Sequence, residues 1–179
     1  MDTDRLFVLT GGPGSGKTTL IEALAAAGVA TSPEVGRAVI REQLAIGGDA
    51  LPWADQLAFA ELMVVRDVAA REAALATGLV TVLDRGIPDV AGFLRVTGLP
   101  VPPHIDAAAR RWRYNRRVFI APYWAEIFTG DAERKQKPEE AQATFAVMSR
   151  TYRDYGYELI ELPRADVAAR VAFIVDRIA

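Results

Sequence analysis

Short apolar runs alternate along the chain with longer segments in which apolar residues recur every three or four positions. Runs of four to eight apolar residues predict buried strands. Such runs lie at residues 6–9, 79–83, 117–121 and 157–162, with a weaker one near 29–31. A helix is predicted after the first run, at residues 19–24. The alternation of strands and helices predicts an α/β fold with a mainly parallel sheet covered by helices on both faces.

The longest helical pattern runs from about residue 53 to residue 77. Its apolar stripe consists of Trp53, Leu57, Ala60, Val64 and Val68. Gly78 is predicted to end this helix, because glycine readily takes the left-handed conformation of a C-cap. A second stripe, at the end of the chain, predicts a helix capped by Asp166. Ligands of such folds bind outside the carboxyl ends of the strands, so residues that follow strands are candidates for the functional site.

Composition limits the classes of protein that fit. A length of 179 residues suits one domain over residues 1–179, and 51% hydrophobic residues are enough for a core. The net charge of −2 and a pI of about 5.5 argue against a nucleic-acid partner. The absence of cysteine excludes disulfides. The polar N-terminus and the lack of a long apolar run predict a cytoplasmic protein without a membrane span.

Residues 11–18 match the P-loop pattern G-x-x-x-x-G-K-[ST]. They lie between a predicted strand and a predicted helix, where glycines bring backbone N–H groups close to phosphate oxygens and the helix start adds a positive dipole end. Lys17 supplies a charge for the β- and γ-phosphates, and the Thr18 hydroxyl is placed to hold Mg²⁺. Residues 115–118 lack the Asn-Lys-x-Asp element that reads guanine, which favours ATP. The predicted nucleotide-binding residues are Gly12, Pro13, Gly14, Ser15, Gly16, Lys17, Thr18 and Thr19.

Asp84, Arg85 and Gly86 directly follow a predicted strand. A carboxylate at this point can coordinate Mg²⁺ through water or accept a proton from an attacking hydroxyl. The planar guanidinium of Arg85 can hold a phosphate or carboxylate, and Gly86 permits a sharp turn away from the sheet. The alternative is a solvated loop with a local ion pair.

Glu34 and Arg37 follow the weak second strand. They are predicted to line an acceptor pocket in which Arg37 faces an anionic group. An ordinary helix start explains them almost as well, because acidic residues favour first turns.

Residues 128–137 carry charges of both signs and one glycine. We interpret them as part of a lid at about residues 125–143, in which Arg134 or Lys135 neutralises charge in the transition state. Water must be excluded from phosphoryl transfer, which gives a lid a reason to exist. The alternative is a solvated charged surface.

An arginine-rich segment at residues 110–117 is interpreted as a solvated surface, with Ile105, Ala109 and Trp112 packed inward. Binding of an anionic substrate or of a phosphoinositide is the alternative. The three tryptophans are expected in the core. Trp53 is the one closest to the expected acceptor side.

With these motifs in place, the chain resembles the predicted ATPases grouped with the kinase domain of NadR-type nicotinamide riboside kinases. More distantly it resembles nucleoside and nucleoside-monophosphate kinases. The resemblance covers nearly the whole chain and rests on residues 11–18, 34–37, 84–89 and 128–136. It implies a three-layer P-loop NTPase fold with a five-stranded sheet of order 2-3-1-4-5, which binds ATP with Mg²⁺ at residues 12–19.

The same resemblance implies roles for single residues. Asp84 corresponds to the acidic residue that activates the acceptor hydroxyl or helps to hold Mg²⁺. Arg85 and Arg37 correspond to arginines on the acceptor side, and Arg134 corresponds to a lid arginine. Related proteins also bind nucleotide or lipid without a known kinase activity.

Two functions therefore stay open. The first is a small-molecule kinase that transfers the γ-phosphoryl group of ATP to a nucleoside-, nucleotide- or cofactor-type acceptor. Its predicted catalytic residues are Lys17, Asp84, Arg85 and Arg134, its acceptor-binding residues Glu34, Arg37 and Arg85, and its metal-binding residues Thr18 and Asp84. The second is an ATPase or a nucleotide-dependent binding module, favoured by the lack of a nucleoside-specificity signature and by the arginine-rich segment.

Overall fold

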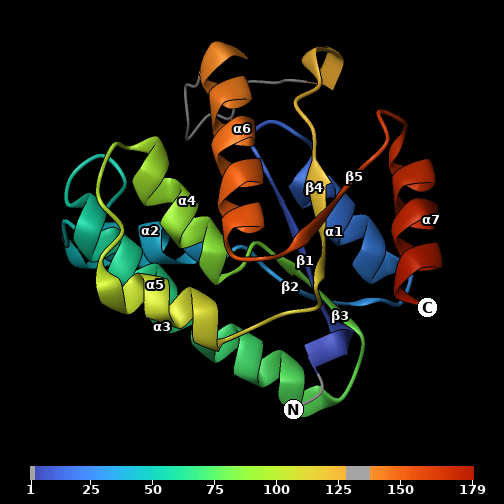
Figure 1. Cartoon of the computed structure of the whole chain (residues 1–179), viewed down its shortest axis with the longest axis horizontal. Helices are drawn as coiled ribbons and strands as arrows, with labels where there is room; N and C mark the ends of the chain where they lie inside the picture. Colours follow the sequence, from blue (N-terminus) through green and yellow to red (C-terminus); the bar gives the residue numbers. More distant parts are fainter. Residues whose placement is uncertain (1–2, 128–137) are drawn as a thin grey trace.

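The computed structural model describes residues 3–127 and 138–179, and its centre is a parallel sheet of order β2-β3-β1-β4-β5 (Figure 1). This is the strand order that the family resemblance implies. The strands are β1 (Leu6–Gly11), β2 (Ala30–Ser32), β3 (Thr81–Asp84), β4 (Arg117–Ala121) and β5 (Glu158–Glu161). The helices are α1 (Lys17–Ala26), α2 (Val35–Ile46), α3 (Gln56–Thr77), α4 (Ile87–Val96), α5 (Pro103–Arg111), α6 (Pro138–Asp154) and α7 (Val167–Ile178).

Both faces of the sheet are covered by helices, and β1 shows why. Leu6 and Val8 point into a core formed with α3, α4, α5 and α6. Phe7 and Leu9, which alternate with them, point into a second core formed with α1 and α7. A parallel strand covered on both faces has no polar side, and this explains the continuous apolar run in the sequence. Figure 1 shows α1 and α7 on one side of the sheet and the larger helical layer on the other.

The ends of two helices agree with the predicted caps. Asp166 accepts a hydrogen bond from the Ala169 N–H at the start of α7 (2.8 Å). Gly78 ends α3 in the left-handed conformation, with φ of 67°. The predicted start of α3 is wrong by three residues, because the carboxylate of Asp55 accepts from the Ala58 N–H (2.9 Å) and the helix begins at Gln56.

The third strand is shifted along the chain relative to its prediction. Leu79 is exposed, and the strand begins at Thr81, which pairs with Leu6 on one side and with Ala30 on the other. The strand therefore ends at Asp84 itself. Asp84, the carboxylate that the sequence predicts to be functional, is thus the last residue of β3 and does not lie in the loop after it.

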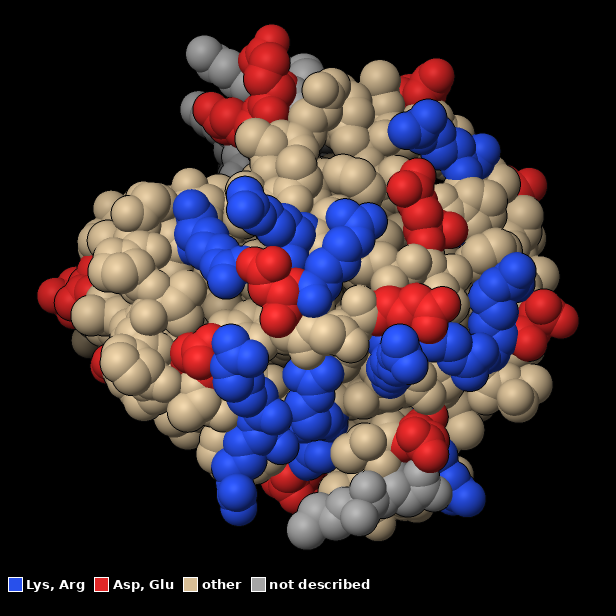
Figure 2. Space-filling view, in the orientation of Figure 1, with Lys and Arg blue, Asp and Glu red and all other residues tan. Residues whose placement is uncertain are grey.

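The arginine-rich segment packs as the solvated surface that the sequence predicts. Ile105 and Ala109 are buried in the core, and Trp112 packs against it. Arg110 pairs with Asp106 (2.8 Å), and the guanidinium of Arg113 lies 3.9 Å from the Tyr157 ring centroid. Figure 2 shows basic and acidic side chains interleaved across this face. Among the described helices, none combines the length and apolarity that crossing a bilayer requires.

Candidate active site

The P-loop connects β1 to α1 by a tight turn whose backbone leaves N–H groups free. Gly14 and Gly16 have φ of 70° and 78°, which side chains with a Cβ rarely adopt. Helix α1 begins at Lys17 after Gly16, and no side chain caps its first N–H groups. These donors and the positive end of the helix face a pocket that suits a phosphate.

This P-loop pocket has a volume of about 520 Å³ and is lined by residues 13–19. The rest of its wall includes Glu34, Arg37, Arg85, Trp124 and Arg170, together with residues 165–167. Gly12, which the sequence also places in the nucleotide site, is buried behind the loop. Its carbonyl accepts hydrogen bonds from Lys17 Nζ (2.6 Å) and from Ser15 Oγ (2.7 Å). Residues 13–19 therefore line the pocket, whereas Gly12 helps to hold the Lys17 side chain.

Lys17 is buried at the bottom of the loop, with 6% of its surface exposed. Its ammonium group donates to the Gly12 carbonyl and to Ser15 Oγ (3.2 Å). Burial, reinforced by the positive charge of Arg85, lowers the pKa of Lys17 to about 7. A phosphate bound beside this group would stabilise its charged form.

Among the residues that the structure describes, Arg85 is the one non-glycine residue with a positive φ, which is 74°. The sequence assigns the sharp turn after β3 to Gly86, and this is wrong, because Gly86 has an extended backbone (φ −153°). Gly86 is needed for space instead. A Cβ there would lie 3.0 Å from the Tyr114 ring and 3.1 Å from Val8. The left-handed turn at Arg85 is strained, and such strain is concentrated at functional sites.

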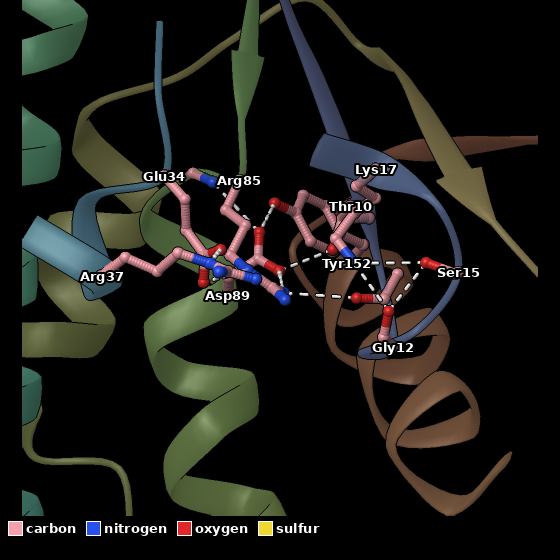
Figure 3. Close-up of polar contacts among 11 residues, drawn as sticks. Thr10, Gly12, Ser15, Lys17, Glu34, Arg37, Arg85, Asp89 and Tyr152 are labelled. Carbon is pink, nitrogen blue, oxygen red and sulfur yellow. Dashed lines mark hydrogen bonds and ion pairs between the residues drawn. The ribbon is translucent and has the colours of Figure 1, made fainter. Parts of the chain in front are cut away.

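The side chain of Arg85 joins groups from three elements (Figure 3). Its Nε donates to Glu34 Oε1 (3.2 Å), and its Nη1 donates to Asp89 Oδ1 (3.1 Å) and to the Gly11 carbonyl (3.3 Å). Burial alone would lower the pKa of Arg85, but the carboxylates of Glu34, Asp89 and Asp84 outweigh it and hold the pKa above its usual value. This arginine is therefore a fixed cation between β1, α2 and α4.

Glu34 bridges two arginines. Its second oxygen, Oε2, accepts from Arg37 Nε (3.1 Å), so Glu34, Arg37 and Arg85 lie together as the sequence predicts. Glu34 also precedes α2, at the N-cap position, but its side chain forms no capping hydrogen bond there. The helix-start explanation for Glu34 therefore accounts for its position and not for its contacts.

Asp84 ends β3 beside this cluster and is almost fully buried. Its Oδ1 has no hydrogen-bond partner within the described ranges. Burial raises the pKa of Asp84, and the charges of Arg85 and Lys17 offset part of this effect. A buried carboxylate oxygen with unused capacity fits a Mg²⁺ ion bound directly or through water, together with the exposed Thr18 hydroxyl.

Asp89 belongs to the 84–89 motif, but the sequence analysis gave it no role; it organises the site from the first turn of α4. Its Oδ1 accepts from Thr10 Oγ1 (2.6 Å) as well as from Arg85, and its Oδ2 accepts from Tyr152 Oη (2.5 Å) and the Gly86 N–H (3.0 Å). Asp89 thereby links β1, α4 and α6 (Figure 3). Its position three residues after a predicted turn is a capping signal, and this was the available clue.

Arg170 was also missed. It lies in the first turn of α7 and is buried beside the P-loop, where its Nη1 donates to the Ser15 carbonyl (3.1 Å). Its Nε and Nη2 are buried without a partner in the part of the chain that the structure describes. Burial lowers the pKa of Arg170. Its place in an apolar stripe of α7 made it inconspicuous in the sequence.

A second pocket of about 320 Å³, which we call the helical cavity, lies among α2, α3, α4 and α6. Its walls include Phe59, Met63, Asp67, Phe93 and Met148, and Trp53 lies at its rim. The prediction that Trp53 packs in the core is wrong, because 59% of its surface is exposed. Trp53 precedes α3 and does not share the buried face of that helix. The helical cavity and the P-loop pocket share Pro13, Glu34 and Arg85.

Trp124 lines the P-loop pocket and is partly buried, so it is not a core residue as predicted, whereas Trp112 packs against the core. Arg134 and Lys135, the residues chosen for the lid, lie outside the described residues. The described parts of the predicted lid are a 3-10 turn at Ala125–Ile127 and the start of α6.

The fold and the loop define the class of this protein. A five-stranded parallel sheet of this order, with a P-loop between β1 and α1, is the P-loop NTPase fold of the kinase-like group. A family model described as an AAA domain matches residues 6–170, and the chain belongs to this family. No curated protein sequence matches the chain at a significant level.

Two solved structures are similar over 97% of this chain. The NadR protein in complex with NR has a TM-score of 0.72 at 19% identity, and the chain spans 50% of the length of that protein. Shikimate kinase from Acinetobacter baumannii in complex with shikimate has a TM-score of 0.56 at 15% identity, and 92% of its length is covered. At these identities the two likenesses establish the fold.

Proposed function

We propose that this protein is an ATP-dependent small-molecule kinase. The observation that supports this most strongly is the contact between the two pockets. The P-loop pocket suits the phosphates of ATP, the helical cavity is enclosed enough for a small acceptor, and Arg85 belongs to the wall of both. An acceptor in the helical cavity would present a hydroxyl group to the γ-phosphate.

In this proposal the P-loop N–H groups and Lys17 hold the β- and γ-phosphates. The acceptor hydroxyl attacks the γ-phosphorus, a new O–P bond forms, and the bond to the bridging oxygen of ADP breaks. Asp84 orients the hydroxyl and takes its proton. Arg85 stabilises the charge on the transferred group, and so does Arg134, which the sequence analysis assigns to a lid.

The same residues suit a metal cofactor. Mg²⁺ held near Thr18 and Asp84 would neutralise phosphate charge when ATP is bound. Lys17 and Arg85 are the positively charged side chains that the protein itself places near the phosphates in this proposal. The NadR and shikimate kinase structures contain NR and shikimate, so nicotinamide riboside and shikimate belong in the first acceptor panel.

The test is turnover with ATP and Mg²⁺ against a panel of nucleosides, nucleotides, shikimate and hydroxylated cofactors, followed by mass spectrometry of the product. We expect one acceptor class to gain a phosphoryl group. Asp84→Asn should reduce this turnover by about 10²- to 10⁴-fold. The control is Asp176→Asn, since Asp176 is exposed on α7.

The alternative outcomes are specific. Full turnover in Asp84→Asn contradicts the role of Asp84. Tight ATP binding without phosphoryl transfer to any acceptor contradicts the kinase and favours an ATPase or a nucleotide-dependent binding module.

A further inference from the structure

The helical cavity contains a carboxyl group that the proposed reaction does not use. Asp67 lies in the middle of α3, only 7% of its surface is exposed, and it lines the cavity. Within residues 3–127 and 138–179, Asp67 takes part in no hydrogen bond or ion pair. Glu34 and Asp89, the other carboxylates of the cavity wall, both bond to Arg85. Asp67 therefore retains hydrogen-bonding capacity for a ligand.

The position of Asp67 is costly for the empty protein. Burial raises the pKa of this carboxyl group well above its usual value, the negative charge of Asp89 raises it further, and Arg85 offsets part of the effect. A buried polar group without a partner costs free energy whether or not it is charged. A ligand that donates a hydrogen bond to Asp67 would recover that cost.

The rest of the cavity wall favours an apolar ring. Phe59 and Phe93 meet edge to face with ring centroids 5.4 Å apart, and Met63 and Val90 lie beside them. A volume of about 320 Å³ is at the lower end of small-molecule sites, which limits the ligand to a compact body. Met and aromatic side chains contact such a body without hydrogen bonds to it.

The charges around Asp67 disfavour an anion at this end of the cavity. Asp67 interacts electrostatically with the carboxylates of Glu34, Asp84 and Asp89, and with the guanidinium of Arg85. Arg85 is already bonded to two of these carboxylates. A negative group placed beside Asp67 would meet like charges in a poorly solvated pocket.

We propose that Asp67 is the specificity-determining residue of the helical cavity. Its carboxyl group binds an N–H or O–H donor on the non-reacting end of the acceptor, and the acceptor carries no negative charge at that end. The inference rests on the proposed function in one respect: the ligand of the cavity is the phosphoryl acceptor.

The test uses ribosides in matched pairs. In each pair the base of one member has no carboxylate, and the base of the other member bears one. The pairs are uridine with orotidine and nicotinamide riboside with nicotinic acid riboside. Binding is measured by calorimetry without ATP for the wild-type chain, for Asp67→Asn and Asp67→Leu, and for the control Glu61→Gln. Glu61 is a half-exposed acid on the same helix, so its variant makes the same chemical change away from the cavity.

We expect the wild type to bind one member without a carboxylate at least tenfold more tightly than its carboxylate partner. In both Asp67 variants this ratio should fall towards one, and Glu61→Gln should keep it. Asp67→Leu should also weaken the preferred riboside by tenfold or more. The ratio compares two ligands on one variant, so a change in the folded fraction alone does not alter it.

Three results would overturn the inference: no riboside of either pair binds the wild type, the carboxylate member binds as well as its partner, or the ratio persists in both Asp67 variants. Turnover assays separate this failure from failure of the kinase proposal. If phosphoryl transfer occurs but the affinity ratio is the same in the wild type and the Asp67 variants, the inference about Asp67 fails and the kinase proposal stands. If the affinity ratio depends on Asp67 as expected but no acceptor receives a phosphoryl group, the kinase proposal fails. Asp67 then still determines which ligand binds in the helical cavity.

Discussion

The P-loop pocket and the helical cavity share a wall at Arg85, but they are made from different parts of the chain. Seven consecutive residues of the P-loop pocket, 13–19, offer backbone N–H groups and one lysine, and the rest of its wall comes from separate segments. The helical cavity is formed mainly by side chains from four helices, and its lining includes three carboxylates, those of Glu34, Asp67 and Asp89. The backbone of the P-loop pocket suits a polyanion, and in our proposal the helical cavity selects its ligand by side chains.

The difference affects how each pocket tolerates mutation. A backbone cradle depends on a few glycines and on the start of α1, whereas a side-chain cavity depends on charges that must balance one another. Arg85 belongs to the walls of both pockets, so we expect its variants to disturb both regions at once.

Arg85→Met should have the largest effect on the molecule. It leaves Glu34 and Asp89 without their shared cation in a buried setting, and breaking such a pair costs about 3 kcal/mol of unfolding free energy. Turnover should fall by 10³-fold or more, because the variant also loses charge beside the transferred phosphoryl group. Urea unfolding and the phosphoryl-transfer assay measure the two effects.

The control for this variant is Arg95→Met, which removes an arginine that pairs with Asp154 at a more exposed site. We expect a loss below about 1 kcal/mol there. Equal losses in the two variants would contradict the special place of Arg85 between the pockets.

Tyr152→Phe should have an intermediate effect and tests the side of the helical cavity formed by α6. The Tyr152 hydroxyl donates to Asp89 Oδ2 in the buried network, and hydrogen bonds to charged groups contribute about 1.5–3 kcal/mol. Turnover should also fall, since Asp89 holds Arg85. Tyr155→Phe is the matched control, because its hydroxyl donates to the more exposed Asp106, and we expect a loss below about 1 kcal/mol. A larger loss in Tyr155→Phe would contradict this ranking.

The same contrast explains what could be predicted from the sequence. The strands and the P-loop were predictable because buried apolar runs and a continuous motif carry them locally, whereas the strand order came from the resemblance to a known family. The proximity of Glu34, Arg37 and Arg85 followed from the rule that strand ends meet. The helical cavity was not predictable in the same way, because helices separated in the sequence contribute single side chains to it.

Asp67 shows the physical limit of the sequence analysis. It continues the helical spacing of Ala60 and Val64, so an acidic residue lies on the inner face of α3. Spacing alone does not tell whether such a residue is neutralised by a partner or faces a cavity. Gly86 and Arg85 are a similar case, since glycine after a strand suggests a turn, yet the packing of Tyr114 explains Gly86 and the turn is at Arg85.

Asp67→Asn should give the smallest effect on stability, and its sign is opposite to that of the other variants. The folded-state pKa of Asp67 is raised by burial and by Asp89, Glu34 and Asp84, with Arg85 opposing them. The unfolded chain therefore releases this proton at a lower pH than the folded chain does, and the wild type loses stability as the pH rises above about 4. Asparagine cannot ionise, so the variant avoids that loss.

We therefore expect Asp67→Asn to be more stable than the wild type at pH 7–8, because the variant has no buried carboxyl group to ionise. The gain should disappear near pH 4, where the wild-type carboxyl group is protonated in the folded state. Urea unfolding of both chains from pH 4 to pH 8 measures this difference. A variant that is less stable at pH 8 would mean that Asp67 is stabilised in the folded chain, and the contrast between a pre-formed P-loop pocket and a helical cavity that keeps an unsatisfied acid for its ligand would then be wrong.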